Sequence, residues 1–182
     1  MFNNMTTVEK QKGFTIVETL MALAVLLIAV AGPVYAIGQS FGSSEVVRDR
    51  TVAKYLAQEG IELVRWYRDN IALAKQNGLT PANWIPTVCT TADGCFMSTV
   101  DAPAQCPTGT CPIMKQSQAT NRYQYLTGND TRFTRTIKIT EIDADMSARV
   151  EVDVTWKSSP LGPTRTASVT SWVYNWTREV NF

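Results

Sequence analysis

The sequence predicts an α+β fold, in which one long amino-terminal helix packs on a three- to four-stranded antiparallel sheet and a disulfide-closed loop region lies between them. Three features predict it: an apolar run that continues into a helical period, four cysteines among prolines, and a carboxyl-terminal third with a period of two. The 182 residues, 45% hydrophobic and 18% charged, are enough for one ordinary domain with an appended segment.

The helix begins with a segment that is apolar enough to cross a membrane. Thr19–Ser44 holds 26 residues without a charge, and about 20 such residues make a helix of ~30 Å, the thickness of a bilayer core. Lys10 and Lys12 precede this run, so we expect the amino end on the cytoplasmic side and the rest exported. A cleaved secretory signal is the alternative, but its small-residue cleavage site should follow the apolar run, whereas Ala29–Gly32 lies deep within it.

From Glu45 to Gln76 the pattern is that of an amphipathic helix. Asn77 and Gly78 predict the end of this helix, and Lys75 in the last turn suits the helix dipole. We therefore predict one helix of about 55–60 residues, which Pro33 should bend or loosen. Its second half has an apolar stripe at steps of three or four, formed by Ala53, Leu56, Gly60, Leu63, Tyr67, Ile71 and Ala74.

The middle of the chain, residues 79–128, predicts loops with short strands, because five prolines interrupt it. The residues between Cys89 and Cys95, and between Cys106 and Cys111, are turn formers. Of the three connectivities that four cysteines allow, we favour 89–95 with 106–111, since each closes a short loop. Zinc is the alternative, but the spacing does not match common zinc ribbons, and paired thiols indicate an oxidising compartment. This region is either a stability device or a displayed contact surface.

Residues 129–182 predict an antiparallel sheet. Apolar and polar residues alternate strictly in Ala148–Lys157, and Phe133–Ile142 and Thr166–Trp176 are the flanking strands, joined by short connectors. The last strand has an aromatic face that we expect to pack against the helix, or at a subunit interface, rather than to bind a ligand. This face consists of Trp172, Tyr174 and Trp176.

Composition excludes several classes of function. The chain has no histidine, which removes imidazole-based catalytic triads and the usual imidazole metal sites. The net charge of +1 gives no electrostatic basis for binding nucleic acid. Asp143 and Asp145 lie in a predicted hairpin turn with too few neighbouring oxygens to assert a calcium site. We therefore expect no catalytic residue, no cofactor and no metal.

The stretch KGFTIVETLMALAVLLIAV, Lys12–Val30, resembles the amino terminus of type IV pilins and of the pseudopilins of type II secretion. That superfamily has a short basic leader ending in glycine, a cleavage site before phenylalanine and a glutamate at the fifth position after it. The resemblance implies that residues 1–13 are a prepilin leader and that a prepilin peptidase cuts between Gly13 and Phe14. The same enzyme would then methylate the new amino group of Phe14.

The resemblance also gives Glu18 a role. A carboxylate in a dry helix bundle is tolerable only beside a cation, and the Phe14 amine of a neighbouring copy would supply that cation and set the axial register. The alternative is that the membrane segment begins at Thr19 and that Glu18 is solvated at the headgroup level.

The implied function is a non-enzymatic filament subunit, a minor pilin or pseudopilin, with residues 14–44 as the membrane and filament-core helix and residues 45–78 as the helix of the head. Its implied partners are the prepilin peptidase, other subunits, an inner-membrane platform with its ATPase, and membrane lipid before assembly. It would be anchored once in the inner membrane and then enter an extracytoplasmic filament. The rival is a single-pass anchored binding protein that does not polymerise, and a secreted enzyme is third.

Overall fold

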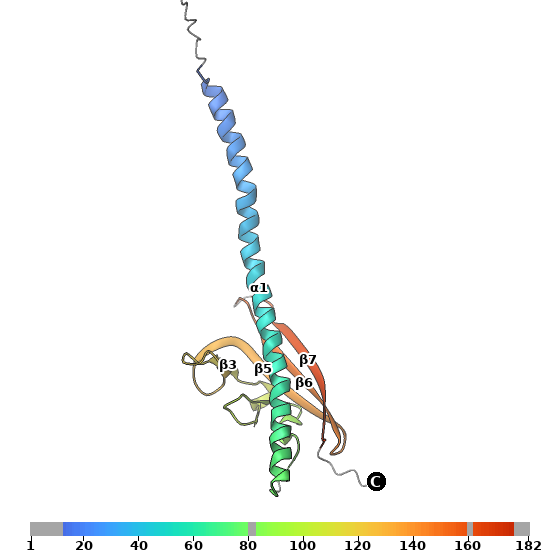
Figure 1. The fold of residues 1–182 in the computed structure, drawn as a ribbon. Coiled ribbons are helices and arrows are strands. Elements are labelled where there is room, and N and C mark those ends of the chain that lie inside the picture. Colours follow the sequence, from blue (N-terminus) through green and yellow to red (C-terminus); the bar gives the residue numbers. More distant parts are fainter. Residues whose placement is uncertain (1–12, 80–82, 160–161, 177–182) are drawn as a thin grey trace, which may run out of the picture. The chain divides into compact units, whose positions relative to one another are not determined.

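The chain forms two compact units, Met1–Ser44 and Glu45–Phe182, and the helix α1, Ile16–Gln76, contributes to both (Figure 1). The computed structural model describes residues 13–79, 83–159 and 162–176. Most of the predicted leader, residues 1–12, lies outside the described residues. Pro33 lies inside α1, which is helical on both sides of it.

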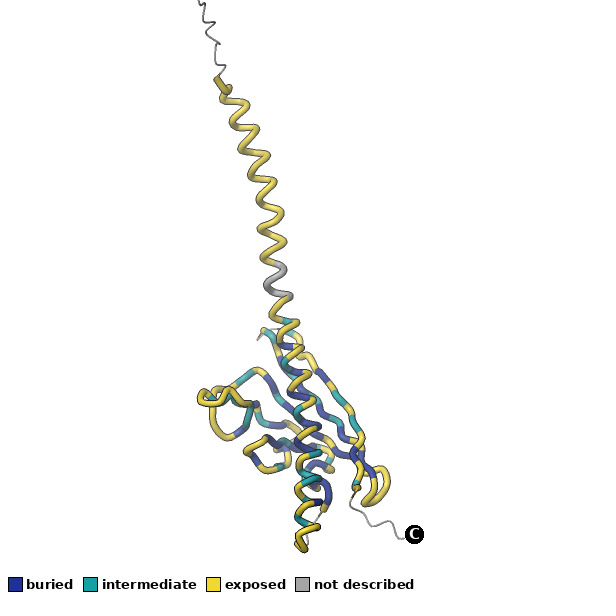
Figure 2. Tube along the Cα trace, in the orientation of Figure 1, coloured by how far each residue is buried: buried dark blue, intermediate teal, exposed yellow. Residues whose placement is uncertain are grey.

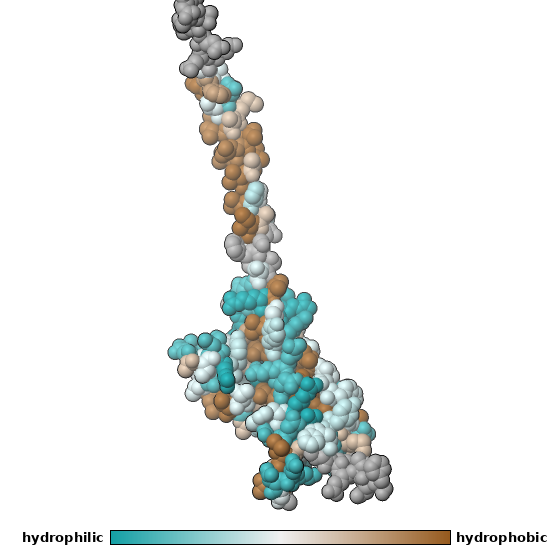
Figure 3. All heavy atoms as spheres, viewed as in Figure 1, coloured by the Kyte–Doolittle hydropathy of each residue, from teal (hydrophilic) through white to brown (hydrophobic). Residues whose placement is uncertain are grey.

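In the first unit, the described residues of the helix up to Gly38 are all exposed. Ile16–Gly38 has a mean hydropathy of 2.5 and is long and apolar enough to cross a membrane, yet none of it is buried. Figure 2 shows this segment exposed, and Figure 3 shows its surface as mostly hydrophobic. The sequence-based prediction of an all-round apolar first half is confirmed.

In the second unit α1 buries the first four residues of its predicted stripe against the sheet, whereas Tyr67, Ile71 and Ala74 are half-buried. The approach is closest at Gly60, where a Cβ atom would lie 2.7 Å from a Val152 methyl carbon. The helix ends as predicted, because Gly78 has a φ of +76° and its N–H donates to the Lys75 carbonyl at 3.0 Å. The helical residues of the core are Ala53, Leu56, Ala57, Ile61, Leu63 and Val64.

Three long antiparallel strands form the main part of the sheet. They are β5 (Asn129–Asp143), β6 (Ser147–Trp156) and β7 (Arg165–Tyr174). β7, which pairs only with β6 among the described strands, lies at the edge of the sheet. The β6–β7 register is continuous, whereas β5–β6 shifts near its hairpin end. The side chains that face α1 come from alternate positions, as the period of two predicted. The β6 residues of the core are Ala148, Val150, Val152, Val154 and Trp156.

The predicted loop region adds strands of its own, so the sheet has seven strands rather than three or four. β1 and β3 both pair with β5, at the edge opposite β6, because a long strand leaves backbone groups that need partners. β2 pairs antiparallel with β1, and β4 pairs antiparallel with β3. The elements of this region are η1 (Thr87–Cys89), β1 (Cys95–Phe96), β2 (Ala104–Gln105), η2 (Pro107–Gly109), β3 (Ile113–Gln116) and β4 (Tyr123–Gln124).

The predicted packing of the β7 aromatic face against the helix is wrong for Trp172 and Tyr174, and the alternative, a subunit interface, stays a prediction. Trp172 and Tyr174 are 49% and 57% exposed, and Trp176 beyond the strand is also exposed. The smaller side chains of β7, such as the buried Val173, alternate with them and face the core. Ser171 accepts a hydrogen bond from Arg65 of α1 at 2.9 Å, so Trp172, the next residue, lies on the opposite face of the strand. The Trp176 indole, beyond the strand, does reach the helix, because its N–H donates to the Asp69 carboxylate at 3.3 Å.

Candidate functional site

The predicted cleavage residues directly precede α1. Phe14 is exposed, and Thr15 caps the helix because its hydroxyl oxygen accepts a hydrogen bond from the Glu18 N–H at 3.3 Å. Glu18 therefore lies in the first turn, where an acidic side chain suits the helix dipole. Within the part of the chain that the structure describes, no cation pairs with the Glu18 carboxylate.

The surface that follows Glu18 is apolar on every side. Leu20, Leu23 and Leu27 each expose more than half of their area, and so do the branched residues between them. An apolar surface of this extent is not stable in water. The first unit therefore needs lipid or other apolar helices around it.

Two disulfides fix the loop region on the sheet. Cys89 pairs with Cys95, and Cys106 with Cys111, the connectivity favoured from the spacing. All four cysteines are buried, and Cys95 belongs to β1. The turn before it needs glycine, because Gly94 has a φ of +73° and a Cβ atom there would lie 2.8 Å from a carbonyl oxygen of β5.

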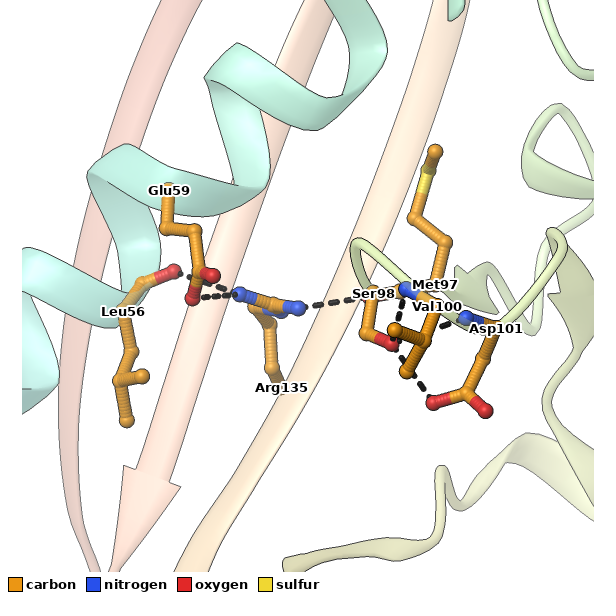
Figure 4. A network of polar contacts seen from close by, with 7 residues as sticks. All are labelled: Leu56, Glu59, Met97, Ser98, Val100, Asp101 and Arg135. Carbon is orange, nitrogen blue, oxygen red and sulfur yellow. Dashed lines mark hydrogen bonds and ion pairs between the residues drawn. The ribbon is translucent and has the colours of Figure 1, made fainter. Parts of the chain in front are cut away.

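A buried arginine joins α1, β5 and the loop region (Figure 4). Arg135 has no exposed surface. Its Nη1 donates to the Leu56 carbonyl at 3.1 Å and to the Glu59 carboxylate at 2.9 Å, and its Nη2 donates to the Met97 carbonyl at 2.6 Å. Such a charge is tolerated in a core because several acceptors replace water. We call this set of contacts the Arg135 clamp.

The loop beyond Met97 is closed by a second set of polar contacts, also drawn in Figure 4. The Ser98 hydroxyl donates to the Asp101 carboxylate at 2.6 Å and accepts the Asp101 N–H at 3.0 Å. The same carboxylate accepts the Tyr125 N–H at 2.8 Å. These hydrogen bonds hold the tip at Thr99 and Val100 in one position.

The Tyr125 phenol is also buried. Burial raises the pKa of this phenol, and the nearby Arg135 charge opposes the shift.

A third charged cluster ties the start of the head helix to β5. Arg132 contacts Glu45 at 2.9 Å and Asp49 at 2.8 Å. Hydrogen bonds to Glu45, and then to Asp49, raise the pKa of Arg132 above its ordinary value. Asp49 is buried and also accepts a hydrogen bond from Ser158 at 3.0 Å.

A groove of about 290 Å³ lies between α1 and the tip of the loop at Thr99. Its floor is the buried Leu63, and its most exposed apolar side chain is Trp66. The lining residues are Glu59, Glu62, Leu63, Trp66 and Thr99. We call this feature the acidic groove.

Sequence reasoning missed the Arg135 clamp and the Asp101 contacts. A signal existed for Arg135, which occupies the buried register of β5 between Phe133 and Ile137. Asp101 gave no signal, because it lies in a loop without periodicity. Among the described residues no group of three or more His, Cys, Asp or Glu side chains could hold a metal ion.

Comparison with known families identifies the amino-terminal segment. Residues 9–32 match the family described as the prokaryotic N-terminal methylation motif. This motif is the prepilin signature of type IV pilins and pseudopilins, a structural class. No curated protein and no solved structure matches the chain. The chain therefore carries the prepilin signature, and within it begins the one apolar helix among the described residues that fits single-pass anchoring. The layout of the chain is α+β, like that of pilins.

Proposed function

We propose that the protein is a structural subunit of a type IV pilus or of a type II secretion-like filament, as a minor pilin or pseudopilin. The observation that carries this proposal is the apolar helix of 23 residues, unburied, that begins within the matched motif. Cleavage between Gly13 and Phe14 by a prepilin peptidase removes the lysines of the leader and leaves an apolar amino end. Methylation of the Phe14 amine follows.

Glu18 then directs assembly. An unpaired carboxylate in hydrocarbon costs ~2.5–3.5 kcal/mol on insertion scales. The Phe14 amine of a neighbouring copy neutralises it when the two helices lie in one register, and a slip leaves two charges uncompensated. Thr15 supports this role, because its cap fixes Glu18 in the first helical turn.

Leaving the membrane requires external work. Before assembly, lipid already covers the apolar helix, so helix–helix packing gains little from the hydrophobic effect. We infer that an inner-membrane platform with a cytoplasmic ATPase supplies this work, as in the family. The amino end is cytoplasmic before assembly, and the disulfide-closed head lies outside the cytoplasm, where thiols are oxidised.

Mass spectrometry of the mature amino terminus tests the proposal. In the native host we expect a terminal peptide that begins at methylated Phe14. A functional protein that still begins at Met1 in the host would contradict the proposal. That result would favour an anchored binding protein. A terminus beyond Ala36 would favour a secreted protein cut by a signal peptidase. A Gly13→Val variant should remain uncut, because a branched side chain hinders close approach of the backbone to the peptidase.

A further inference from the structure

We propose that copies of this chain bind one another head to tail, with a basic helical face of one copy seated on the acidic groove of the next. The basic face consists of Arg48, Lys54 and Tyr55, all exposed on α1 within the second unit. This inference rests on the proposed function as a filament subunit and names the surface through which heads meet. Within the proposed function, it favours a pseudopilin that repeats along the filament over a minor pilin that occurs singly.

The acidic groove combines a largely apolar lining with two carboxylates, those of Glu59 and Glu62. The Glu62 side chain is 66% exposed, and that of Glu59 is 36% exposed. The cation that pairs with Glu59 is the fully buried Arg135, so it lies beneath the surface. Arg65 contacts one oxygen of Glu62, which leaves the other oxygen for an incoming cation. Leu63 and Trp66 supply the apolar contact area.

The wall of the groove is held in place before any partner arrives. Thr99 lies between Met97, whose carbonyl accepts from Arg135, and Asp101, whose carboxylate is bound by Ser98 (Figure 4). The clamp and the loop contacts thus fix the position of an otherwise exposed tip. A preorganised wall lowers the entropy lost on binding.

The basic face has the complementary character. Among the described residues, neither Arg48 nor Lys54 forms an ion pair. The acids close to Arg48 in sequence, Glu45 and Asp49, are engaged by Arg132. Tyr55 follows Arg48 by seven residues and so lies on the same side of the helix. Tyr55 is 67% exposed and supplies an apolar body beside the two cations.

The two surfaces cannot meet within one chain. Lys54 and Glu62 are eight residues apart on one helix, which is a rise of about 12 Å. A second copy that is turned to face the first and displaced along the helix axis brings them together, with opposite charges facing. Such a heterologous contact leaves a free surface at each end and so generates open, helical assemblies.

A zero-length cross-link tests this contact in assembled, full-length protein. Filaments from a mixture of unlabelled and ¹⁵N-labelled cells are treated with a carbodiimide, which joins a carboxylate to an amine only where they touch. We expect a peptide pair that joins Glu62 to Lys54, with mixed isotope labels that prove it is intermolecular. Glu62 joined to a different lysine, joined to another protein, or left unjoined would overturn the proposal.

Charge reversal tests the energetics of the same contact. We expect Lys54→Glu and Glu62→Lys each to reduce incorporation into sheared filaments about fivefold, because like charges then face each other. The double variant should restore incorporation to near the wild-type level. The matched control is Arg149→Glu with Glu151→Lys on the outer face of β6, which should change nothing.

The outcomes separate this inference from the proposed function. If the mature chain does not begin at Phe14, or does not enter filaments at all, the proposed function fails. If the wild type assembles but both reversals are neutral, or the double variant is no better than the single ones, only the head-to-tail contact fails. Intact disulfides in each variant show that the head has folded.

Discussion

The two parts of helix α1 differ in how far their side chains are buried. Every residue of Ile16–Gly38 is exposed, whereas Glu45–Gln76 packs a stripe of side chains against β5, β6 and β7. The second part has one apolar face and a sheet of the same chain to cover it; the first is apolar all round, and its cover must come from elsewhere. The second part is therefore stabilised by folding of its own chain. The first part needs apolar partners from outside the chain, and for this reason we propose that it is the part that assembles.

The largest effect should come from the charge at the start of the first part. We expect Glu18→Leu to leave cleavage before Phe14 intact and to lower incorporation into filaments by about tenfold or more, because the neighbouring amine loses its partner. Immunoblots of sheared and cell-bound fractions measure this. Glu18→Asp keeps the charge and should lose less. Normal incorporation of Glu18→Leu would contradict the docking role.

The next effect concerns the Arg135 clamp in the second part. Arg135→Leu leaves Glu59 and the Met97 carbonyl without their donor, so we expect the free energy of unfolding to fall by about 2–4 kcal/mol. Thermal unfolding of the full chain in detergent measures it. Arg149→Leu, on the exposed face of β6, is the matched control and should change stability by less than about 0.5 kcal/mol.

Removing one disulfide should have a smaller effect. Cys89→Ser with Cys95→Ser opens a short loop, and loop-closure entropy predicts a loss of roughly 2 kcal/mol in the free energy of unfolding. The same unfolding measurement applies. An unchanged unfolding temperature would mean that the pairing of β1 with β5 holds this loop without the covalent bond.

The smallest effect compares one glycine from each part. Gly60→Ala introduces a Cβ atom 2.7 Å from Val152, so we expect a loss of about 1–2 kcal/mol in the free energy of unfolding of the head. Gly32→Ala meets nothing within 4 Å in the single chain and should leave that quantity unchanged. Equal losses at the two positions would contradict the assignment of packing to the second part alone.

The sequence predicted what depends on local pattern. The apolar run, the stop at Gly78, the alternation in β6 and the two short disulfide loops all follow from neighbouring residues, and the structure agrees with each. The motif that contains Gly13, Phe14 and Glu18 could also be recognised from the sequence, because it is one continuous segment.

What it did not predict depends on contacts between distant residues. The pairing of β1 and β3 with β5, the Arg135 clamp and the acidic groove each join segments that lie far apart in the chain. The exposure of Trp172 and Tyr174 was missed for the same reason. Alternation shows that a strand has two faces, but the face that meets the helix is set by the close fit of small side chains.

Photo-cross-linking from the first part tests the central claim most directly. A benzophenone amino acid in place of Val17, in the full chain within its native host, reports what covers this surface after assembly. We predict a cross-link to the amino-terminal segment of another subunit, near its own Phe14, that disappears in the Glu18→Leu background. Cross-links to lipid alone in purified filaments, or an unchanged subunit cross-link without Glu18, would contradict the account.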